Sequence, residues 1–428
     1  MSKLKVFLGV AAPVAVVSII TACGGGGSSS STAARSVSAA DVTSNYVDIA
    51  YAMYSDSLST AESLQTAVTA LLATPTEDNL ELARAAYKAA RVPYQQSEIL
   101  RWDTDITLGS NTGDAGIESV DEWEGQVNAW PLAEGLIDYV DGGDGNNIIS
   151  GVETIDSAYL MAQNGVDDND ANVATGVHAI EFLLWGQDLN DTEAGSGERP
   201  ATDYDTGAGC TNGNCDRRAQ YLEVATELLV SDLTNMVAEW SPAAVSTDGT
   251  LAYNFVNHDD AIAYIAGSMK VMADDELAGA RMGSALELGD TEEEHDCFSD
   301  LSHVAIYNNF QGIKNAFYGT YSSANGDSTI SGASFGTLLK QTDSNTYSTI
   351  DAAFTSIEAK MAAIQTLGET ADPILKFDQI IGLGEGNEHY DNANAASLEL
   401  VELGIELDLA RQALALAELN TGGGGDGD

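Results

Sequence analysis

Apolar residues recur at helical spacing along most of this 428-residue chain, and this periodicity constrains the fold more than any other feature. It runs through residues 42–72, 77–102, 173–185, 217–240, 259–288, 349–367 and 392–419. The alternating pattern typical of strands is scarce, so we predict an all-α fold. Long irregular loops rich in Gly, Asp, Asn and Ser are expected at residues 104–125, 142–170, 188–215 and 322–333. The helical segments divide near residues 245–250.

The N-terminus has the pattern of a bacterial lipoprotein signal. Lys3 and Lys5 precede an apolar run over residues 6–20, which is shorter than the length that a membrane-spanning helix usually needs. Small residues then lead to Cys23, as in the lipobox where such precursors are cut. We predict that residues 1–22 are removed and that Cys23 carries the lipid. The alternative is an ordinary signal peptide followed by an incidental cysteine.

The chain ends of the mature protein are expected to be flexible. Residues 23–40 form a predicted Gly/Ser tether behind the lipid, and residues 421–428 a disordered Gly/Asp tail. The signal places the protein in the bacterial cell envelope. Gly24 after the lipidated cysteine, in place of Asp, favours the outer membrane, with the protein facing the periplasm or the cell surface.

The chain is strongly acidic. The precursor has 17 basic and 66 acidic residues, and loss of Lys3 and Lys5 changes the net charge from −49 to −51 (15 − 66). This charge argues against nucleic acid as a natural partner, because phosphate recognition needs a basic surface. It is compatible with cation binding, although a solvated surface suited to salty water is the more common explanation.

Three further cysteines follow Cys23. Cys210 and Cys215 bracket the turn-prone sequence Thr-Asn-Gly-Asn, and an oxidising envelope favours a disulfide between them. A metal clip formed by the two thiolates is the alternative, but no other Cys or His lies near them in the sequence. Cys297 is then left as a free, buried thiol.

The segment 176–186 carries the most informative motif, Gly-x-His-x-x-Glu. On a helix, His178 and Glu181 are three residues apart and project from one face. Such a pair can ligate one metal ion, or its two members can hydrogen-bond to each other. Phe182 and Trp185 lie beside them and would place the pair in an apolar wall. The motif alone does not decide between a metal site and a structural pair.

Further segments resemble one known family. They are Trp-Pro-Leu at 130–132, Gly-Glu-Arg-Pro at 197–200, Glu-Leu-Ala-Gly-Ala-Arg-Met at 276–282 and Cys-Phe-Ser-Asp at 297–300. Together with Gly176, His178 and Glu181, they are similar to the recurrent motifs of the imelysin family, in its branch of iron-regulated envelope proteins. The resemblance spans roughly residues 46–416, and the motifs keep the family order. Ala280 departs from it, because an acidic residue is expected before Arg281.

The resemblance implies a fold and a role. The fold would be two helical bundle halves, about residues 41–245 and 250–420, related by an approximate internal two-fold, with the motif near their interface. The role would be in bacterial iron uptake. We therefore expect His178 and Glu181 to bind iron, as Fe2+ or Fe3+, or an iron chelate. Another divalent metal is the alternative, and an envelope transporter is the expected protein partner.

Other residues of the matching segments are candidates for the same site. Glu98, which follows Pro93 in its predicted helix, is the expected additional ligand. Arg281, Ser299 and Asp300 are expected to orient the ligands or to receive a chelator. The acidic run 292–294 with His295 is a further candidate for cation binding, but a solvated acidic loop is the favoured interpretation.

Two other functions stay open. Some relatives are classed as metallopeptidases, and a zinc peptidase needs about three protein ligands, an open coordination position and a general base. The signatures His-Glu-x-x-His and His-x-x-Glu-His are absent, and Phe182 stands where the latter needs its second histidine. A binding role is therefore favoured over an enzymatic one. A surface receptor or adhesin for a larger partner is the third hypothesis, because the loops are long.

Overall fold

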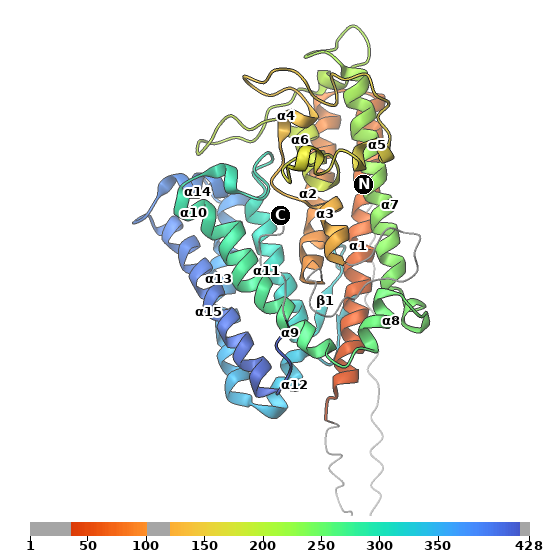
Figure 1. The fold of residues 1–428 in the computed structure, drawn as a ribbon. Helices are drawn as coiled ribbons and strands as arrows, with labels where there is room; N and C mark the ends of the chain where they lie inside the picture. Colours follow the sequence, from red (N-terminus) through yellow and green to blue (C-terminus); the bar gives the residue numbers. More distant parts are fainter. Residues whose placement is uncertain (1–35, 101–119, 420–428) are drawn as a thin grey trace, which may run out of the picture. The chain divides into compact units, whose positions relative to one another are not determined.

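The first helices begin where the sequence supplies capping side chains. In the computed structural model, which describes residues 36–100 and 120–419, Ser38 caps α1 (Ala39–Ala73) in a reciprocal arrangement with Asp41. Thr76 caps α2 (Glu77–Ser97) by accepting a hydrogen bond from the backbone of Asn79. Each helix buries one face and leaves the other in solvent. The two helices pack against each other (Figure 1).

The rest of the described chain is also mainly helical. The helices are η1 (Glu98–Leu100), α3 (Val120–Val127), α4 (Glu134–Ile137), α5 (Ser157–Met161), η2 (Val166–Asp168), α6 (Gly176–Trp185), η3 (Ala201–Tyr204), α7 (Cys215–Trp240), η4 (Ala244–Ser246), α8 (Leu251–Val256), α9 (Ala261–Val271), η5 (Met272–Gly283), α10 (Ser284–Leu288), η6 (Thr291–Glu293), α11 (Ser302–Tyr318), α12 (Phe335–Thr342), α13 (Ser344–Glu369), α14 (Phe377–Leu383) and α15 (Glu388–Ala413). Two short strands, β1 (Thr320–Ser322) and β2 (Thr329–Ser331), pair antiparallel with Thr320 opposite Ser331. The predicted all-α fold is confirmed.

Two groups of helices meet through α2 and α11. In the first group, α1 packs against α2 and α7, and α7 packs against α6. In the second group, α15 packs against α13, η5 and α9. Helix α11 contacts α2 and η1 of the first group and α13 and η5 of the second. The described residues from Val37 onward belong to one compact unit. The boundary near residues 245–250 and the internal two-fold stay predictions.

A π-helical segment, η5, runs between α9 and α10. A π-helix bonds each residue to the fifth one along, so side chains five apart come close together. Glu276 and Arg281 have this spacing, and Arg281 Nε donates to Glu276 Oε1 at 2.6 Å. Both side chains are buried. The π-helical geometry therefore pairs two charged groups that an α-helix would point in different directions.

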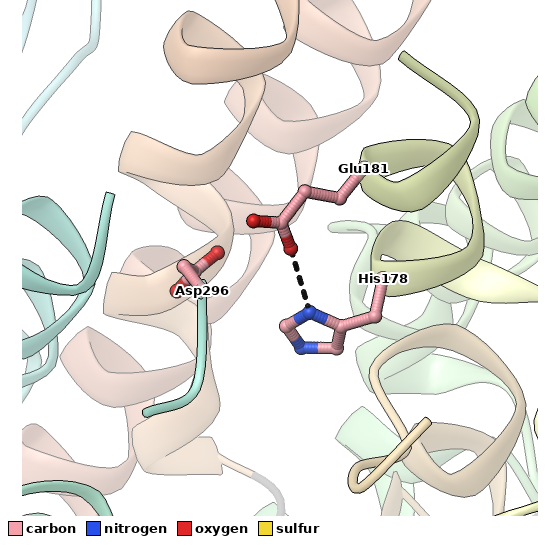
Figure 2. A group of neighbouring side chains, drawn as sticks. All are labelled: His178, Glu181 and Asp296. Carbon is pink, nitrogen blue, oxygen red and sulfur yellow. Dashed lines mark hydrogen bonds and ion pairs between the residues drawn. The ribbon is translucent and has the colours of Figure 1, made fainter. Parts of the chain in front are cut away.

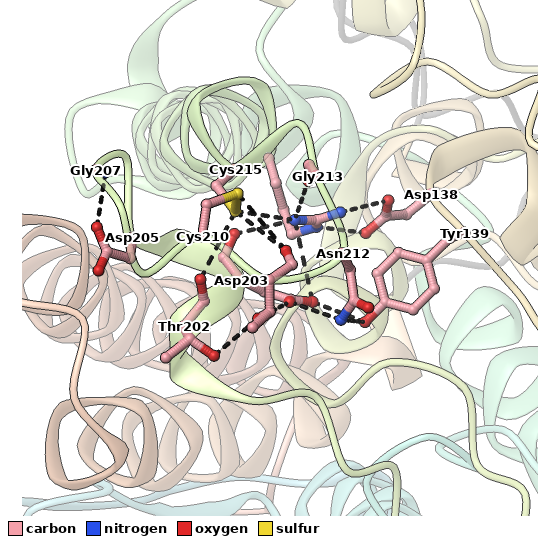
Figure 3. The surroundings of a disulfide bond; sticks show 12 residues. Asp138, Tyr139, Thr202, Asp203, Asp205, Gly207, Cys210, Asn212, Gly213 and Cys215 are labelled. Atoms are coloured by element: carbon pink, nitrogen blue, oxygen red, sulfur yellow. Dashed lines mark hydrogen bonds and ion pairs between the residues drawn. A yellow bond between two sulfur atoms is a disulfide. The ribbon is translucent and has the colours of Figure 1, made fainter.

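A disulfide between Cys210 and Cys215 closes the loop that leads into α7, and the two Cα atoms are 5.9 Å apart. Arg218, in the first turns of α7, donates to both carboxylate oxygens of Asp138, at 2.6 and 3.0 Å. Arg218 Nη1 also donates to the backbone oxygen of Asp203 at 3.0 Å. Figure 3 shows the disulfide beside this network. The disulfide therefore closes this loop covalently, and the hydrogen bonds of Arg218 to Asp138 and Asp203 hold it against the neighbouring segments.

Some predicted features lie outside the described residues. They are the signal peptide, the lipidated Cys23, most of the tether and the tail at 421–428. Within the described ranges, no helix combines the length and the apolar character needed to cross a membrane.

Candidate metal centre

Helix α6 holds His178 and Glu181 in the protein interior. All of its residues are buried, so it is a core helix and not an amphipathic surface helix. The two side chains are one turn apart and project from the same side of α6 (Figure 2). His178 Nδ1 lies 3.0 Å from Glu181 Oε2. This distance suits a hydrogen bond, and it also suits two neighbouring ligands, which lie about 3 Å apart when each is about 2.1 Å from one octahedral ion.

Gly176, the first residue of the motif, allows α6 to begin close to the end of α3. Its φ of +81° is in the left-handed region, and a Cβ there would lie 2.3 Å from the backbone oxygen of Val127. The start of α6 therefore packs directly on the end of α3. Gly176 is needed for this close approach of two backbones, which places His178 and Glu181.

Asp296 is the third member of the cluster, and it comes from the segment between η6 and α11. One potential ligand atom from each of His178, Glu181 and Asp296 lies within 4.8 Å of the other two. All three side chains are buried. Figure 2 shows Asp296 facing the α6 pair from its separate segment. No other group of three His, Cys, Asp or Glu side chains in the described part of the chain has this spacing.

Arg91 of α2 holds Asp296. Arg91 Nε and Nη2 donate to the two carboxylate oxygens at 2.8 and 3.1 Å. Arg91 Nη1 donates to the side-chain oxygen of Asn128 at 2.8 Å. Because this ion pair is fully buried, its hydrogen bonds must compensate the loss of water. Arg91 thus fixes the orientation of Asp296 and balances its charge.

Glu181 is held on both of its oxygens. Oε1 accepts hydrogen bonds from the backbone N–H of Ser299 at 3.0 Å and from its hydroxyl at 2.5 Å. Oε2 accepts one from the Tyr87 hydroxyl at 3.3 Å. Burial raises the pKa of Glu181 to about 7, even though Ser299 and Arg91 counteract part of the effect of burial. Near neutral pH this carboxyl group therefore exchanges its proton readily.

His178 is packed among aromatic rings. The ring centroid of Trp130 is 4.8 Å from that of His178, and the centroid of His295 is 4.7 Å away. Burial lowers the pKa of His178 well below its ordinary value, and the nearby guanidinium of Arg91 lowers it further. Its Nε2 has no hydrogen-bond partner in the described chain. A neutral imidazole with a free nitrogen can serve as a metal ligand.

Glu98, the expected additional ligand, lies in a neighbouring network. Its Oε2 accepts hydrogen bonds from Arg281 of η5 and from Asn309 of α11. Its Oε1 accepts one from Asn128 at 2.9 Å. Asn128 in turn accepts from Arg91, which connects this network to the cluster. Glu98 is not one of the three residues whose ligand atoms converge. Arg281, which was expected to orient the ligands, contacts Glu98.

Ser299 and Asp300, which were expected to orient ligands, face different neighbours. Ser299 contacts Glu181, as described above. Asp300 has a left-handed backbone with φ of +53° and a buried side chain. Burial, together with the charges of the Asp378 and Asp188 carboxylates, raises its pKa to about 8. Asp300 therefore belongs to a second group of acidic side chains, with Asp378 and Asp188, near the cluster.

The sequence analysis missed Asp296, the third member of the cluster, and Arg91, which binds it. Asp296 follows the acidic run 292–294, for which a solvated loop is the interpretation that the sequence favours. That interpretation is wrong from Glu294 onward, because Glu294 and His295 are only 1 % and 2 % exposed. Arg91 could have been recognised from the sequence, because it is one of few basic residues and interrupts the apolar face of its predicted helix. A basic residue at such a position indicates a buried acidic partner.

The donor set fits a divalent cation. The connected network buries four carboxylates and two guanidinium groups: Glu98, Glu181, Glu276 and Asp296 with Arg91 and Arg281. Two negative charges remain when all four acids are ionised, and uncompensated charge is costly in the interior. Protonation of Glu181 removes one of them. A divalent cation between His178, Glu181 and Asp296 would balance both.

Comparisons with known proteins extend these observations. A family model named for peptidase M75 and described as imelysin matches residues 50–406. No curated protein matches the chain. A solved structure described as an iron-regulated protein A precursor, from Parabacteroides distasonis, is 18% identical with a TM-score of 0.60, covering 88% of this chain and 94% of that one. An imelysin-like protein from Psychrobacter arcticus is 12% identical with a TM-score of 0.53, covering 90% and 98%.

The two solved structures show that the helical fold is shared over nearly the whole length of each chain. The family model covers most of this sequence, including the motif around His178 and the segment of Asp296. The resemblance predicted from the motifs is thereby confirmed, and this protein belongs to the imelysin family.

Proposed function

We propose that this protein binds iron in the bacterial envelope, at the centre formed by His178, Glu181 and Asp296, and that it serves iron uptake. The observation that carries the proposal is the convergence of three buried ligand atoms within 4.8 Å. Imidazole and carboxylate ligands suit iron and similar divalent ions. Membership of the imelysin family supports the proposal, as does the shared fold with a protein described as iron-regulated.

Each ligand has its own task in this proposal. His178, kept neutral by burial and by Arg91, offers a lone pair without first losing a proton. Glu181 exchanges the proton that its raised pKa retains for the metal ion. Ser299 keeps one Glu181 oxygen in place during this exchange. Asp296 contributes the second negative charge while Arg91 holds its orientation.

Calorimetric titration of the wild type and three variants tests the proposal. His178→Ala, Glu181→Gln and Asp296→Asn should each weaken the binding of ferrous iron, measured without oxygen, by at least about tenfold. Titrations with ferric citrate and zinc establish which form of metal the centre prefers. Circular dichroism checks that each variant keeps its helices. Equal iron affinity in the wild type and in Glu181→Gln, which preserves the size of the side chain, would overturn the proposal.

A second His–Glu pair in the same chain provides a matched control. His303 Nε2 lies 2.7 Å from Glu369 Oε1, and the His303 side chain is buried. This pair is not part of the converging group. His303→Ala should lower the melting temperature and leave the iron affinity unchanged. Loss of affinity in this variant as well would show that the effect of His178→Ala is structural.

Metallopeptidase activity is the second candidate function, because the matching family model bears the name of a peptidase. It predicts hydrolysis of a peptide library by the zinc-loaded wild type and none by Glu181→Gln. That result would favour the enzyme over iron binding. Iron affinity without peptide cleavage would favour the proposal made here.

A further inference from the structure

A cavity lined by carboxylates lies beside the metal centre. The lining acids, here called the acidic cavity, are Glu134, Asp188, Asp191, Glu292, Glu294 and Asp378. Thr291, Cys297 and Phe298 complete the lining. These residues come from four segments: the start of α4, the loop after α6, the segment around η6, and α14. The cavity shares no lining residue with the group of His178, Glu181 and Asp296.

Two acids of the cavity are buried without compensation. Glu294 is 1 % exposed and Asp378 is 3 % exposed. None of their four carboxylate oxygens accepts a hydrogen bond of good geometry in the described chain, although the Ser302 hydroxyl lies near Glu294 and backbone N–H groups lie near Asp378. The charges of Asp378 and Asp300 act on Glu294 unfavourably. Buried polar groups in native proteins are almost always paired, so these two acids require an explanation.

The other lining acids have only neutral partners or none. Asp188 Oδ1 accepts from the backbone and the amide of Asn190, at 2.9 and 3.0 Å. Asp191 Oδ1 accepts from the Thr291 hydroxyl at 3.2 Å. Glu134 Oε2 accepts from the amide of Gln187 at 3.4 Å. Such bonds orient the carboxylates and leave their negative charges uncancelled.

The nearest basic side chain does not cancel this charge. Lys376 acts electrostatically on Asp378 and Asp300. Its Nζ, however, lies 3.9 Å from the Glu369 carboxylate, with which it forms an ion pair. No ion pair to a lining acid of the cavity is found in the parts of the chain that the structure describes. The lining acids of the cavity therefore have no cationic partner among the described residues.

We infer that the acidic cavity binds a calcium ion, separately from the iron centre. Oxygen is the dominant potential ligand, and Ca2+ takes six to eight oxygen ligands in flexible geometry. The acids come from four segments, an irregular arrangement that Mg2+ tolerates poorly because it demands near-ideal octahedral geometry. No three of their oxygens reach the mutual spacing seen at the iron centre, so at most two of these acids would bind the ion directly and backbone oxygens or water would have to supply its other ligands.

The calcium ion has a structural consequence for the neighbouring centre. Glu294 and Phe298 flank Asp296 in one segment, and both line the cavity. An ion held by Glu294 and Asp378 ties this segment to α14 and to the loop after α6. The calcium site thus stabilises the segment that presents Asp296, although it does not depend on iron binding there.

Calorimetric titration of the purified full chain with calcium chloride tests the inference, at about 150 mM NaCl to screen diffuse binding by surface acids. We expect one saturable site that prefers Ca2+ over Mg2+. Glu294→Gln and Asp378→Asn should each weaken it by at least about tenfold, since each removes one charge from the coordinating group. Glu293→Gln is the matched control, because Glu293 is exposed and does not line the cavity. Equal calcium affinity in all four proteins, or no saturable site, would overturn the inference.

Melting temperatures separate ion binding from a merely structural role. Without calcium, Glu294→Gln should melt at a higher temperature than the wild type, because a neutral amide replaces a carboxyl group buried among other acids. With saturating calcium the order should reverse, since only the wild type gains the ion. A variant that is less stable under both conditions would contradict the inference. Glu181→Gln should keep the calcium response, so failure of the iron proposal and failure of this one are distinguishable.

Discussion

Asp232 of α7 shows how burial controls titration in this protein. It is 8 % exposed, and its Oδ2 accepts a hydrogen bond from the neutral amide of Gln126 at 2.8 Å. Burial raises its pKa from 3.8 to about 6. The folded state then holds the proton more tightly than the unfolded state does. Such a group contributes stability below about pH 4, and that contribution is lost as the pH rises through about 6.

Asp232→Asn should remove this dependence. The amide keeps the size of the side chain and the contact with Gln126, but it does not titrate. Between pH 4 and pH 7, the free energy of unfolding of the wild type should fall relative to that of the variant by about 2 kcal/mol. Urea unfolding at several pH values measures this difference. Parallel curves for the two proteins would show that Asp232 titrates normally.

Gly176 makes a second prediction at the scale of single residues. Gly176→Ala imposes a left-handed backbone on alanine and drives its Cβ into Val127. The first effect costs about 1–2 kcal/mol and the clash about 1–3 kcal/mol more. Gly145 has a similar φ of +76° with nothing near its missing Cβ. Gly145→Ala should therefore lose only the first amount. Denaturant unfolding of both variants separates the two contributions, and equal losses would contradict the packing argument.

At the scale of elements, the strong periodicity of apolar residues was sufficient to predict the long helices. The predicted segments 42–72 and 217–240 correspond to α1 and α7 within a few residues. Helix α11 (Ser302–Tyr318) was not predicted, although it is central to the packing. Its Asn308 and Asn309 are polar and yet buried, because their side chains bond to other helices or to the preceding turn. Polarity in a core helix therefore concealed it from a pattern of apolar spacing.

In the candidate site too, local contacts could be predicted from the sequence and long-range contacts could not. His178 and Glu181 could be paired from the sequence, because helical geometry fixes the relation of residues three apart. Asp296 is more than 100 positions away in the sequence, and only the tertiary fold brings it to them. The π-helical turn of η5 was equally hidden, since Glu276 and Arg281 do not share a face at α-helical spacing.

Arg281 joins η5 to η1 and α11, so its loss should weaken the contact between the two helix groups. It donates to Glu276, Glu98 and Asn309, all of which are buried. Arg281→Met should lower the free energy of unfolding by about 3–5 kcal/mol, because it leaves buried carboxylates unpaired. Adding Glu98→Gln should recover part of this loss. Chemical denaturation of the single and double variants measures the coupling, and additive losses would argue against it.

At the scale of the whole molecule, the N-terminal sequence pattern that ends at Cys23 predicts a lipid-anchored protein. Cys23→Ser should leave the precursor uncut at this position and without lipid. The protein should then move from the membrane fraction to the soluble fraction, because the acyl chains supply the anchoring. Cell fractionation and intact-mass measurement test this. A variant that remains acylated and bound to membranes would refute the lipoprotein prediction.

Salt dependence follows from the overall charge. Raising NaCl from about 10 mM to about 1 M weakens ion pairs such as Lys314–Glu358 and Lys360–Glu399, each worth at most about 1 kcal/mol. The same change screens repulsion among 66 acidic residues that face only 17 basic ones. Repulsive pairs greatly outnumber attractive ones, so the melting temperature should rise with salt.

Calorimetry in the presence of a calcium chelator tests this expectation without interference from divalent ions. The rise should shrink near pH 4, where about half of the exposed carboxylates take up protons and the repulsion is already reduced. Sucrose, which adds no charge, serves as the control for a general effect of solutes on stability. A melting temperature that falls as NaCl increases would mean that the ion pairs outweigh the repulsion, in spite of their small number.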